Sequence, residues 1–213
     1  MNKFENRSYT FEIRAEENEE NVGVITGRPI VYDSRTDLGY FDEIIERGAL
    51  DKTDLKDVKF LVNHDTSKIP LARSRNNNAN STMQLSVDEQ GLAIRVNLDI
   101  ENNSEARNLY SAIKRGDITG MSFMFGVNGE EWEDLDSDHP TRHIKSISTV
   151  VEVSAVTFPA YESTSISARD KNKEALDNAR ATLDSVKKDN ALDSAKQLEL
   201  EKLKLINRMK GVF

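Results

Sequence analysis

Midway along the chain stands the run Gly120-Met121-Ser122-Phe123-Met124-Phe125-Gly126, in which one small hydroxyl lies among bulky apolar side chains between two glycines. The side chains of a β-strand alternate between two faces, so a strand here puts Ser122 and Met124 on one face. The other face then holds Met121, Phe123 and Phe125. A lone serine in such a run is most often a packed core residue, and the sharper alternative is a nucleophile. The rest of the chain decides between the two.

Composition bounds the class of protein. The chain has 213 residues, enough for one sizeable domain plus an appendage. Hydrophobic residues make up 37% and charged residues 31%, which is more polar than an average globular domain and indicates a part outside any core. The net charge of −8 argues against a general nucleic-acid binder held by phosphate contacts.

Cysteine is absent, which excludes disulfides, thiol nucleophiles and thiolate metal sites. No apolar run approaches the roughly 18 residues of a membrane span. The first seven residues carry charges with no apolar segment behind them, unlike a signal peptide. We therefore expect a soluble protein of the cytoplasmic type that binds neither membrane nor nucleic acid.

Alternating apolar residues predict a mainly β domain with a few helices, an α+β fold built as a barrel. Helical spacing and turn residues predict one helix from Ser104, as the N-cap, to Arg115, with Gly116 just beyond it. The expected strands span residues 8–14, 22–32, 58–62, 83–87, 92–98, 118–127 and 143–156.

Composition changes abruptly at Arg169. Residues 170–208 contain no glycine, proline or aromatic residue, and several apolar residues recur at intervals of seven. This pattern predicts a domain over residues 1–168 and a charged helical tail with weak coiled-coil character over residues 169–213. The alternative is a mobile, solvated tail with helical propensity.

Metal and cofactor sites are not expected. The chain has three histidines, His64, His139 and His143. The last two are four residues apart, but Pro140 lies between them in a β-prone context, so they would not share a helix face as a zinc pair must. Phosphate-cradling glycine loops are also absent, which disfavours a nucleotide enzyme.

Serine chemistry is compatible with three residues. A serine nucleophile needs a general base, and that base needs a partner that fixes its tautomer. His64 follows an apolar strand, and Glu152 lies in a β run where a buried carboxylate is costly unless it is paired. The plainer alternatives are a satisfied loop histidine and a solvent-facing glutamate on an edge strand.

Four ordered blocks carry a resemblance to a known family. They are Gly39-Tyr-Phe-Asp-Glu43 with Glu46-Arg-Gly-Ala-Leu50, Val58-Lys-Phe-Leu-Val-Asn-His64-Asp65, Gly120-Met-Ser-Phe-Met-Phe125, and Glu152-Val-Ser-Ala-Val-Thr-Phe-Pro-Ala-Tyr161. Each block is weak alone. As an ordered set, over about residues 8–167, they resemble the prohead (capsid maturation) serine proteases of tailed bacteriophages.

The resemblance implies a fold and a catalytic triad. The family is related to the herpesvirus assembly proteases, so it implies a closed β-barrel ringed by helices. Ser122 would be the nucleophile, His64 the general base and Glu152 the orienting acid, with backbone N–H groups forming an oxyanion hole. His143 is the alternative third member, because the related viral proteases use a second histidine. Pro70-Leu-Ala-Arg73 departs from the family, which often has a glycine after the leucine.

The resemblance also implies an activity. The chain would be a serine endopeptidase that cleaves the internal scaffolding segment of the major capsid protein, and itself. It would act as a dimer or higher oligomer inside the assembling procapsid in the host cytoplasm, without a cofactor. The tail from about Asp170 would dock on the scaffold or capsid interior and be removed on maturation.

Two other functions compete with this one. The first is a non-catalytic scaffold or capsid-assembly protein built on the same domain, which the tail favours. The second is a lipase or esterase, but Met124 stands where the second glycine of a G-x-S-x-G elbow should be.

Overall fold

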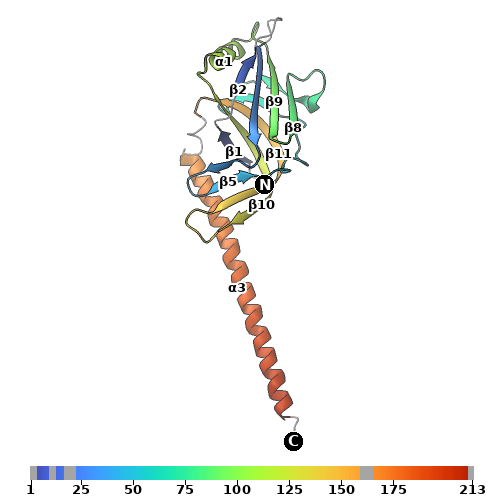
Figure 1. Cartoon of the computed structure of the whole chain (residues 1–213), viewed down its shortest axis with the longest axis vertical. Coiled ribbons are helices and arrows are strands. Elements are labelled where there is room, and N and C mark those ends of the chain that lie inside the picture. The colour runs from blue at the N-terminus through green and yellow to red at the C-terminus, as the bar shows by residue number, and fades with distance from the viewer. Residues whose placement is uncertain (1–3, 10–12, 17–22, 159–165, 211–213) are drawn as a thin grey trace. The chain divides into compact units, whose positions relative to one another are not determined.

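The computed structural model describes residues 4–9, 13–16, 23–158 and 166–210. The chain divides into two compact units, Met1–Asn172 and Lys173–Phe213. The first unit holds two β-sheets and a helix (Figure 1).

The larger sheet is built around two long antiparallel strands, β10 (Gly120–Glu133) and β11 (Thr141–Val156). The first strand of the chain, β1 (Phe4–Tyr9), pairs antiparallel with the other edge of β10. β10 therefore lies between β1 and β11, and β1 is an edge strand of this sheet.

Four short strands complete the larger sheet on the far side of β11. They are β5 (Asp42–Ile45), β4 (Arg35–Asp37), β6 (Lys59–Val62) and β7 (Ala72–Arg73). β11 is long enough to pair in parallel with two of them, with β5 near its start and with β6 near its end. β4 and β7 then pair antiparallel with β5 and β6.

The smaller sheet is antiparallel and has the order β2, β3, β9, β8. Its strands are β2 (Ile13–Glu16), β3 (Gly23–Val31), β9 (Gly91–Leu98) and β8 (Met83–Asp88), and β8 and β9 form a tight hairpin. A single 3-10 turn, η1 (Arg75–Asn77), precedes β8.

Helix α1 (Ser104–Arg115) forms where its spacing predicts it. Its N-cap is Asn103 rather than Ser104, because the extended backbone of Asn103 lets its side chain accept from two N–H groups of the first turn. Gly116 ends the helix at a φ of 78°, a left-handed conformation that glycine adopts without strain. The helix buries a single face, made of Ala106, Leu109 and Ile113.

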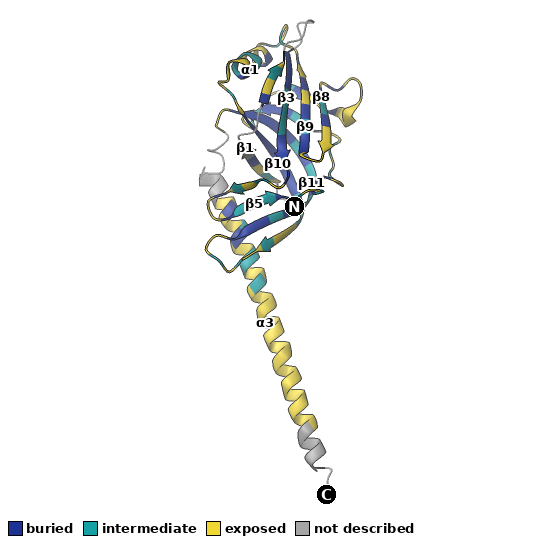
Figure 2. Cartoon of the chain, viewed as in Figure 1, coloured by how far each residue is buried: buried dark blue, intermediate teal, exposed yellow. Residues whose placement is uncertain are grey.

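The two sheets and α1 share one hydrophobic core. The buried strands stand out in Figure 2. From β10 the core receives Met121, Phe123 and Phe125, the face that the alternation predicts, and these three side chains are completely buried. The burial of one face fixes the direction in which Ser122 points, because a slip of one residue would exchange the two faces.

The expected closed barrel is not what the strand pairing shows. Within the described residues the strands form two separate sheets, whereas a closed barrel needs the edge strands of the sheets to pair with one another. The smaller sheet ends at β2 and β8, with no ladder to the larger one. The broader expectation is confirmed: the fold is α+β, mainly β, and it has a long C-terminal helix.

The N-terminal segment also differs from the prediction of one strand over residues 8–14. β1 ends at Tyr9 in the larger sheet, and β2 begins at Ile13 in the smaller one. Residues 10–12 lie outside the described part of the chain. The alternation of Tyr9 and Ile13 thus belongs to two strands in two sheets.

A buried cluster of charges attaches β1 to the rest of the sheet. Arg7 donates to both carboxylate oxygens of Glu43, at 2.5 and 2.7 Å. Arg142 donates to Glu43 at 3.0 Å and to the two oxygens of Glu5 at 2.7 and 2.9 Å. Glu130 also pairs with Arg142. Arg7, Glu43 and Arg142 are at most 6% exposed, so their charges depend on one another for solvation.

Helix α3 (Ile166–Lys210) belongs to both units. Within the first unit, the buried Asn172 donates from Nδ2 to the carbonyl oxygen of Leu38 at 3.4 Å. Within the second unit, several large apolar side chains are half exposed, namely Val186, Leu192, Leu198, Leu200 and Leu203. No helix in the described residues is long and apolar enough to cross a membrane.

The charge cluster makes stability depend on pH through Glu5. Burial alone would raise the pKa of this carboxyl, but the charges of Arg7 and Arg142 outweigh burial and lower that pKa to about 2. Because the unfolded chain takes up this proton at higher pH, the contribution of Glu5 is complete above about pH 4.5 and disappears as the pH falls toward 2.

We therefore expect Glu5→Gln to be less stable than the wild type at pH 7 and to converge with it near pH 2. Urea unfolding of both proteins at a series of pH values measures the difference. A difference that stays constant over this range would contradict the assignment.

Candidate active site

Ser122 lies on β10 with its hydroxyl on the face opposite the core side chains. Its relative exposure is 0%, and its backbone pairs with Ser8 of β1 on one side and Ser154 of β11 on the other. Ser122 Oγ donates to the carbonyl oxygen of Arg7 at 2.8 Å. Met124 shares this face, as the alternation predicts, and is partly buried.

His64 lies in a tight turn at the end of β6. Asn63 and His64 both have positive φ angles, 50° and 57°, and the N–H of Asp65 bonds the carbonyl oxygen of Val62 at 3.1 Å. Few residues adopt this backbone without strain, and asparagine is one of the more tolerant. Asn63 also bonds Thr157 through its side chain, so the turn is fixed to the chain after β11.

Glu152 lies on β11 and is 1% exposed. β11 is an inner strand, with β10 on one side and β6 on the other at this point, so the alternative of a solvent-facing glutamate on an edge strand is wrong. Oε1 of Glu152 forms a short hydrogen bond with Nδ1 of His64. The cost of burying this carboxylate is thereby reduced by a partner.

Ser122, His64 and Glu152 form one continuous chain of contacts. Nε2 of His64 lies 2.5 Å from Oγ of Ser122, and Nδ1 of the same ring bonds Glu152. A carboxylate that accepts a hydrogen bond from Nδ1–H leaves Nε2 as the unprotonated, basic nitrogen beside the hydroxyl. This arrangement can take a proton from serine and stabilise the imidazolium that results.

Ser154 also belongs to this group of contacts, although its sequence context alone did not indicate a role. Its Oγ donates to Oε2 of Glu152 at 2.6 Å and accepts from the backbone N–H of His64 at 3.2 Å. It therefore holds both Glu152 and the turn that carries His64. The available signal was its position two residues after Glu152, which puts both side chains on the same face of the strand.

His143 lies elsewhere in the sheet. Its Nδ1 contacts Glu46 at 2.9 Å and its Nε2 contacts Glu133 at 3.3 Å. The carboxylate beside the ring of His64 is that of Glu152. The geometry thus favours Glu152 over His143 as third member of a triad.

His139 belongs to an exposed group with Asp37 and Asp42, whose ligand atoms lie within 4.8 Å of one another. The carboxylate of Asp42 already bonds Nη1 of Arg35 at 2.7 Å and Nε2 of His139 at 3.2 Å. These contacts account for the group as surface ion pairs.

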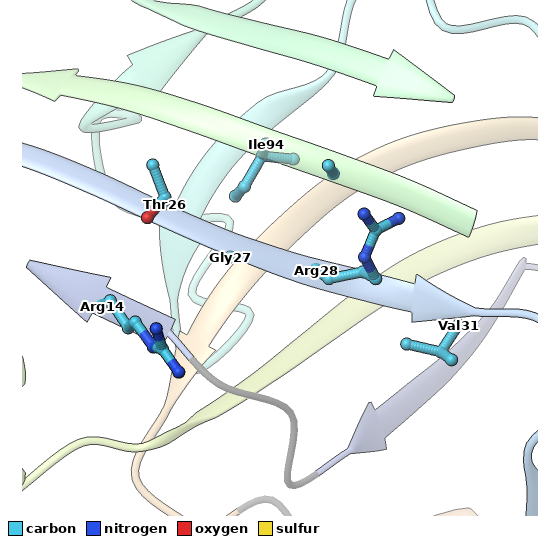
Figure 3. A pocket seen from close by; sticks show the side chains of 7 residues that line it. Arg14, Thr26, Gly27, Arg28, Val31 and Ile94 are labelled. Carbon is cyan, nitrogen blue, oxygen red and sulfur yellow. The ribbon is translucent and has the colours of Figure 1, made fainter. Parts of the chain in front are cut away.

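Two of the cavities lined by described residues lie on the first unit. One, of about 490 Å³, lies on the smaller sheet between β2, β3 and β9 (Figure 3). Ser122, His64 and Glu152 are not among the residues that line it. The other, of about 480 Å³, is lined by Val62 and Asn63 next to His64, by Ile118 and by one face of α1. The neighbours of His64 in the chain, Asn63 and Asp65, both line this cavity.

Comparison with known sequences points to one family. Residues 9–179 match the sequence profile of the Caudovirus prohead serine proteases. The prohead protease of Enterobacteria phage HK97 is 29% identical over 150 residues, which span 68% of this chain and 60% of that relative. The solved structure of the bacteriophage T4 capsid assembly protease aligns with a TM-score of 0.42 and 11% identity, over 72% of this chain and 97% of that one.

Ser154 provides a test of how the site is held. When the hydroxyl of Ser154 is removed, the carboxylate of Glu152 loses a hydrogen-bond donor and the backbone N–H of His64 loses its acceptor. Ser154→Ala should therefore lower kcat for peptide hydrolysis about tenfold while KM changes little. Steady-state kinetics with a peptide substrate measures both constants.

The matched control is Ser148→Ala. Ser148 lies on the same strand and its Oγ donates across to Gly126 of β10 at 3.0 Å, without touching the three residues. Equal effects of the two substitutions would mean that Ser154 acts only on the stability of the sheet.

Proposed function

Because the chain belongs to the caudovirus prohead serine protease family, we propose that it is a serine endopeptidase of capsid maturation whose triad is Ser122, His64 and Glu152. The observation that carries the proposal is the chain of contacts from the Ser122 hydroxyl through the His64 ring to the Glu152 carboxylate. The matched profile covers all three residues.

The chemistry follows from these positions. Oγ of Ser122 attacks the carbonyl carbon of the scissile bond while Nε2 of His64 takes its proton. The same nitrogen then gives that proton to the leaving amine, and the acyl-enzyme forms. Water, activated by His64, releases the acid and regenerates the serine. Glu152 keeps the ring in the required tautomer and stabilises its charged form, and Ser154 holds Glu152.

The proposed substrate is the scaffolding segment of the major capsid protein, together with the protease itself. The place of action would be the interior of the assembling procapsid in the host cytoplasm, and the active form would be self-associated. The support for this part is the family and the HK97 relative, a prohead protease of which the chain spans 60%.

Co-expression with the capsid protein tests the activity. Ser122→Ala should abolish cleavage of both the capsid protein and the chain, with far-UV circular dichroism unchanged, because no other group replaces the nucleophile. Mass spectrometry of the products gives the cleavage positions. The control is Ser86→Ala, an exposed serine on β8. Unchanged processing by Ser122→Ala would favour the non-catalytic scaffold protein instead.

For the tail we propose a docking role on the scaffold or the capsid interior, ending in its removal on maturation. The half-exposed apolar side chains of α3 support the proposal, among them Leu192, Leu198 and Leu203. Exposed leucines along a charged helix are typical of a helix that pairs with a partner.

A chain that ends after Asn172 tests the tail, since that residue keeps its buried contact with Leu38. The shortened protease should cleave peptides like the full-length chain but enter procapsids at least several-fold less often. Quantitative immunoblotting of purified procapsids measures the difference. Equal packaging of the two forms would contradict the docking role.

A further inference from the structure

We propose that Asn63 is a positioning residue for the reaction: its side chain, bonded to Thr157, holds the turn that presents His64 to the nucleophile. This inference rests on the proposed function. It adds to the site a pair of side chains that touches neither the substrate nor the reacting atoms. The pair acts on the reaction only through the orientation of the general base.

The first support is the conformation of the turn. Asn63 and His64 follow one another with φ angles of 50° and 57°. A tight turn with two left-handed central residues favours asparagine at the first of them and glycine at the second. Histidine stands at the second position, where its Cβ makes the left-handed backbone costly. Such a backbone persists only where its surroundings hold it, and its relaxation would turn the ring of His64 away from Ser122.

The second support is the two-bond contact between the side chain of Asn63 and Thr157. The backbone N–H of Thr157 donates to Oδ1 of Asn63 at 2.9 Å, and Nδ2 of Asn63 donates to Oγ1 of Thr157 at 3.1 Å. The ladder between β6 and β11 ends just before this contact, with Val62 opposite Ala155. The amide, which has both an acceptor and a donor, therefore continues the pairing where the backbone of β6 turns away.

The third support is the short path from this contact to the base, because His64 follows Asn63 directly. The N–H of His64 donates to Oγ of Ser154 at 3.2 Å, so Ser154 anchors the turn over the face of β11. Thr157 anchors the same turn beyond the end of that strand. Two separate anchors fix the orientation of the ring, whose Nε2 lies 2.5 Å from Oγ of Ser122. A displacement of about 1 Å in such an arrangement can lower a rate about 100-fold.

The first experiment removes the side chain of Asn63 and keeps the turn. Asn63→Gly serves this purpose because glycine adopts the left-handed backbone without strain. The variant loses both bonds to Thr157, so kcat for peptide hydrolysis should fall about tenfold while KM stays within about twofold of the wild-type value. Steady-state kinetics of the full-length chain measures both constants, with a fluorogenic peptide that spans the cleavage position of the capsid protein.

The matched control is Asn77→Gly. Asn77 also has a left-handed backbone, with a φ of 54°, and its side chain makes two bonds to the main chain of Leu85, at 2.7 and 2.9 Å. It lies before β8 of the smaller sheet. The two glycine variants should therefore lose similar stability in urea unfolding, while only Asn63→Gly loses kcat. Equal kcat values in the wild type and both variants would overturn the inference.

The second experiment tests whether the two residues act as a pair. Thr157→Val removes the hydroxyl but keeps the backbone N–H, so it should lower kcat about threefold in the wild-type chain. In the Asn63→Gly chain the same change should have no further effect, because the contact is already lost. Thr157→Ser, which has the hydroxyl, should recover the rate. Losses that multiply in the double variant would show that the residues act separately and would contradict the pair.

Nitrogen NMR of the histidine rings separates this inference from the proposed function, because it observes His64 without the need for activity. In the wild type the proton should lie on Nδ1, which bonds Glu152, and in Asn63→Gly a mixture of the two tautomers should appear. An unchanged tautomer together with an unchanged kcat would mean that Asn63 does not position the base. If no form hydrolyses peptides but the tautomer responds to Asn63→Gly, the proposed function fails and the positioning role stands.

Discussion

The pairing of β10 with β11 is the constraint on which the site depends. Its register sets Ser122 opposite Ser154, and Glu152 lies two residues away on the same face. β6 joins the other edge of β11 with Leu61 opposite Ser154, so the turn after β6 carries His64 to the same place. A slip of one residue between the strands would turn these side chains into the core. The fully buried Met121, Phe123 and Phe125 oppose such a slip, because each would have to leave the core.

The sequence could predict the faces of this sheet but not its connections. Alternation in β10 separates Ser122 from its apolar neighbours, and the apolar run before His64 marks the end of a strand. Ser122 lies 58 positions and Glu152 lies 88 positions after His64 along the chain. The contact between the three side chains therefore depends on the order of the strands in the sheet, which no local pattern records. Ser154 was missed for the same reason: its role exists only because the turn of His64 and the carboxylate of Glu152 both reach it. A barrel was expected from the alternation of apolar residues and, in its closed form, from the family resemblance, but the described strands pair into two separate sheets, and which strands pair is not recorded in a local pattern.

The N-terminal segment is a strand that its local sequence does not predict. Phe4-Glu-Asn-Arg7 is largely polar, and the sequence predicts no strand before Ser8. It forms an ordered strand because Arg7 pairs with Glu43 of β5 and Glu5 pairs with Arg142 of β11. Both partners lie far along the sequence. Buried ion pairs add little net stability over apolar side chains of similar size, but they demand one geometry. In this sheet they fix β1 beside Ser122.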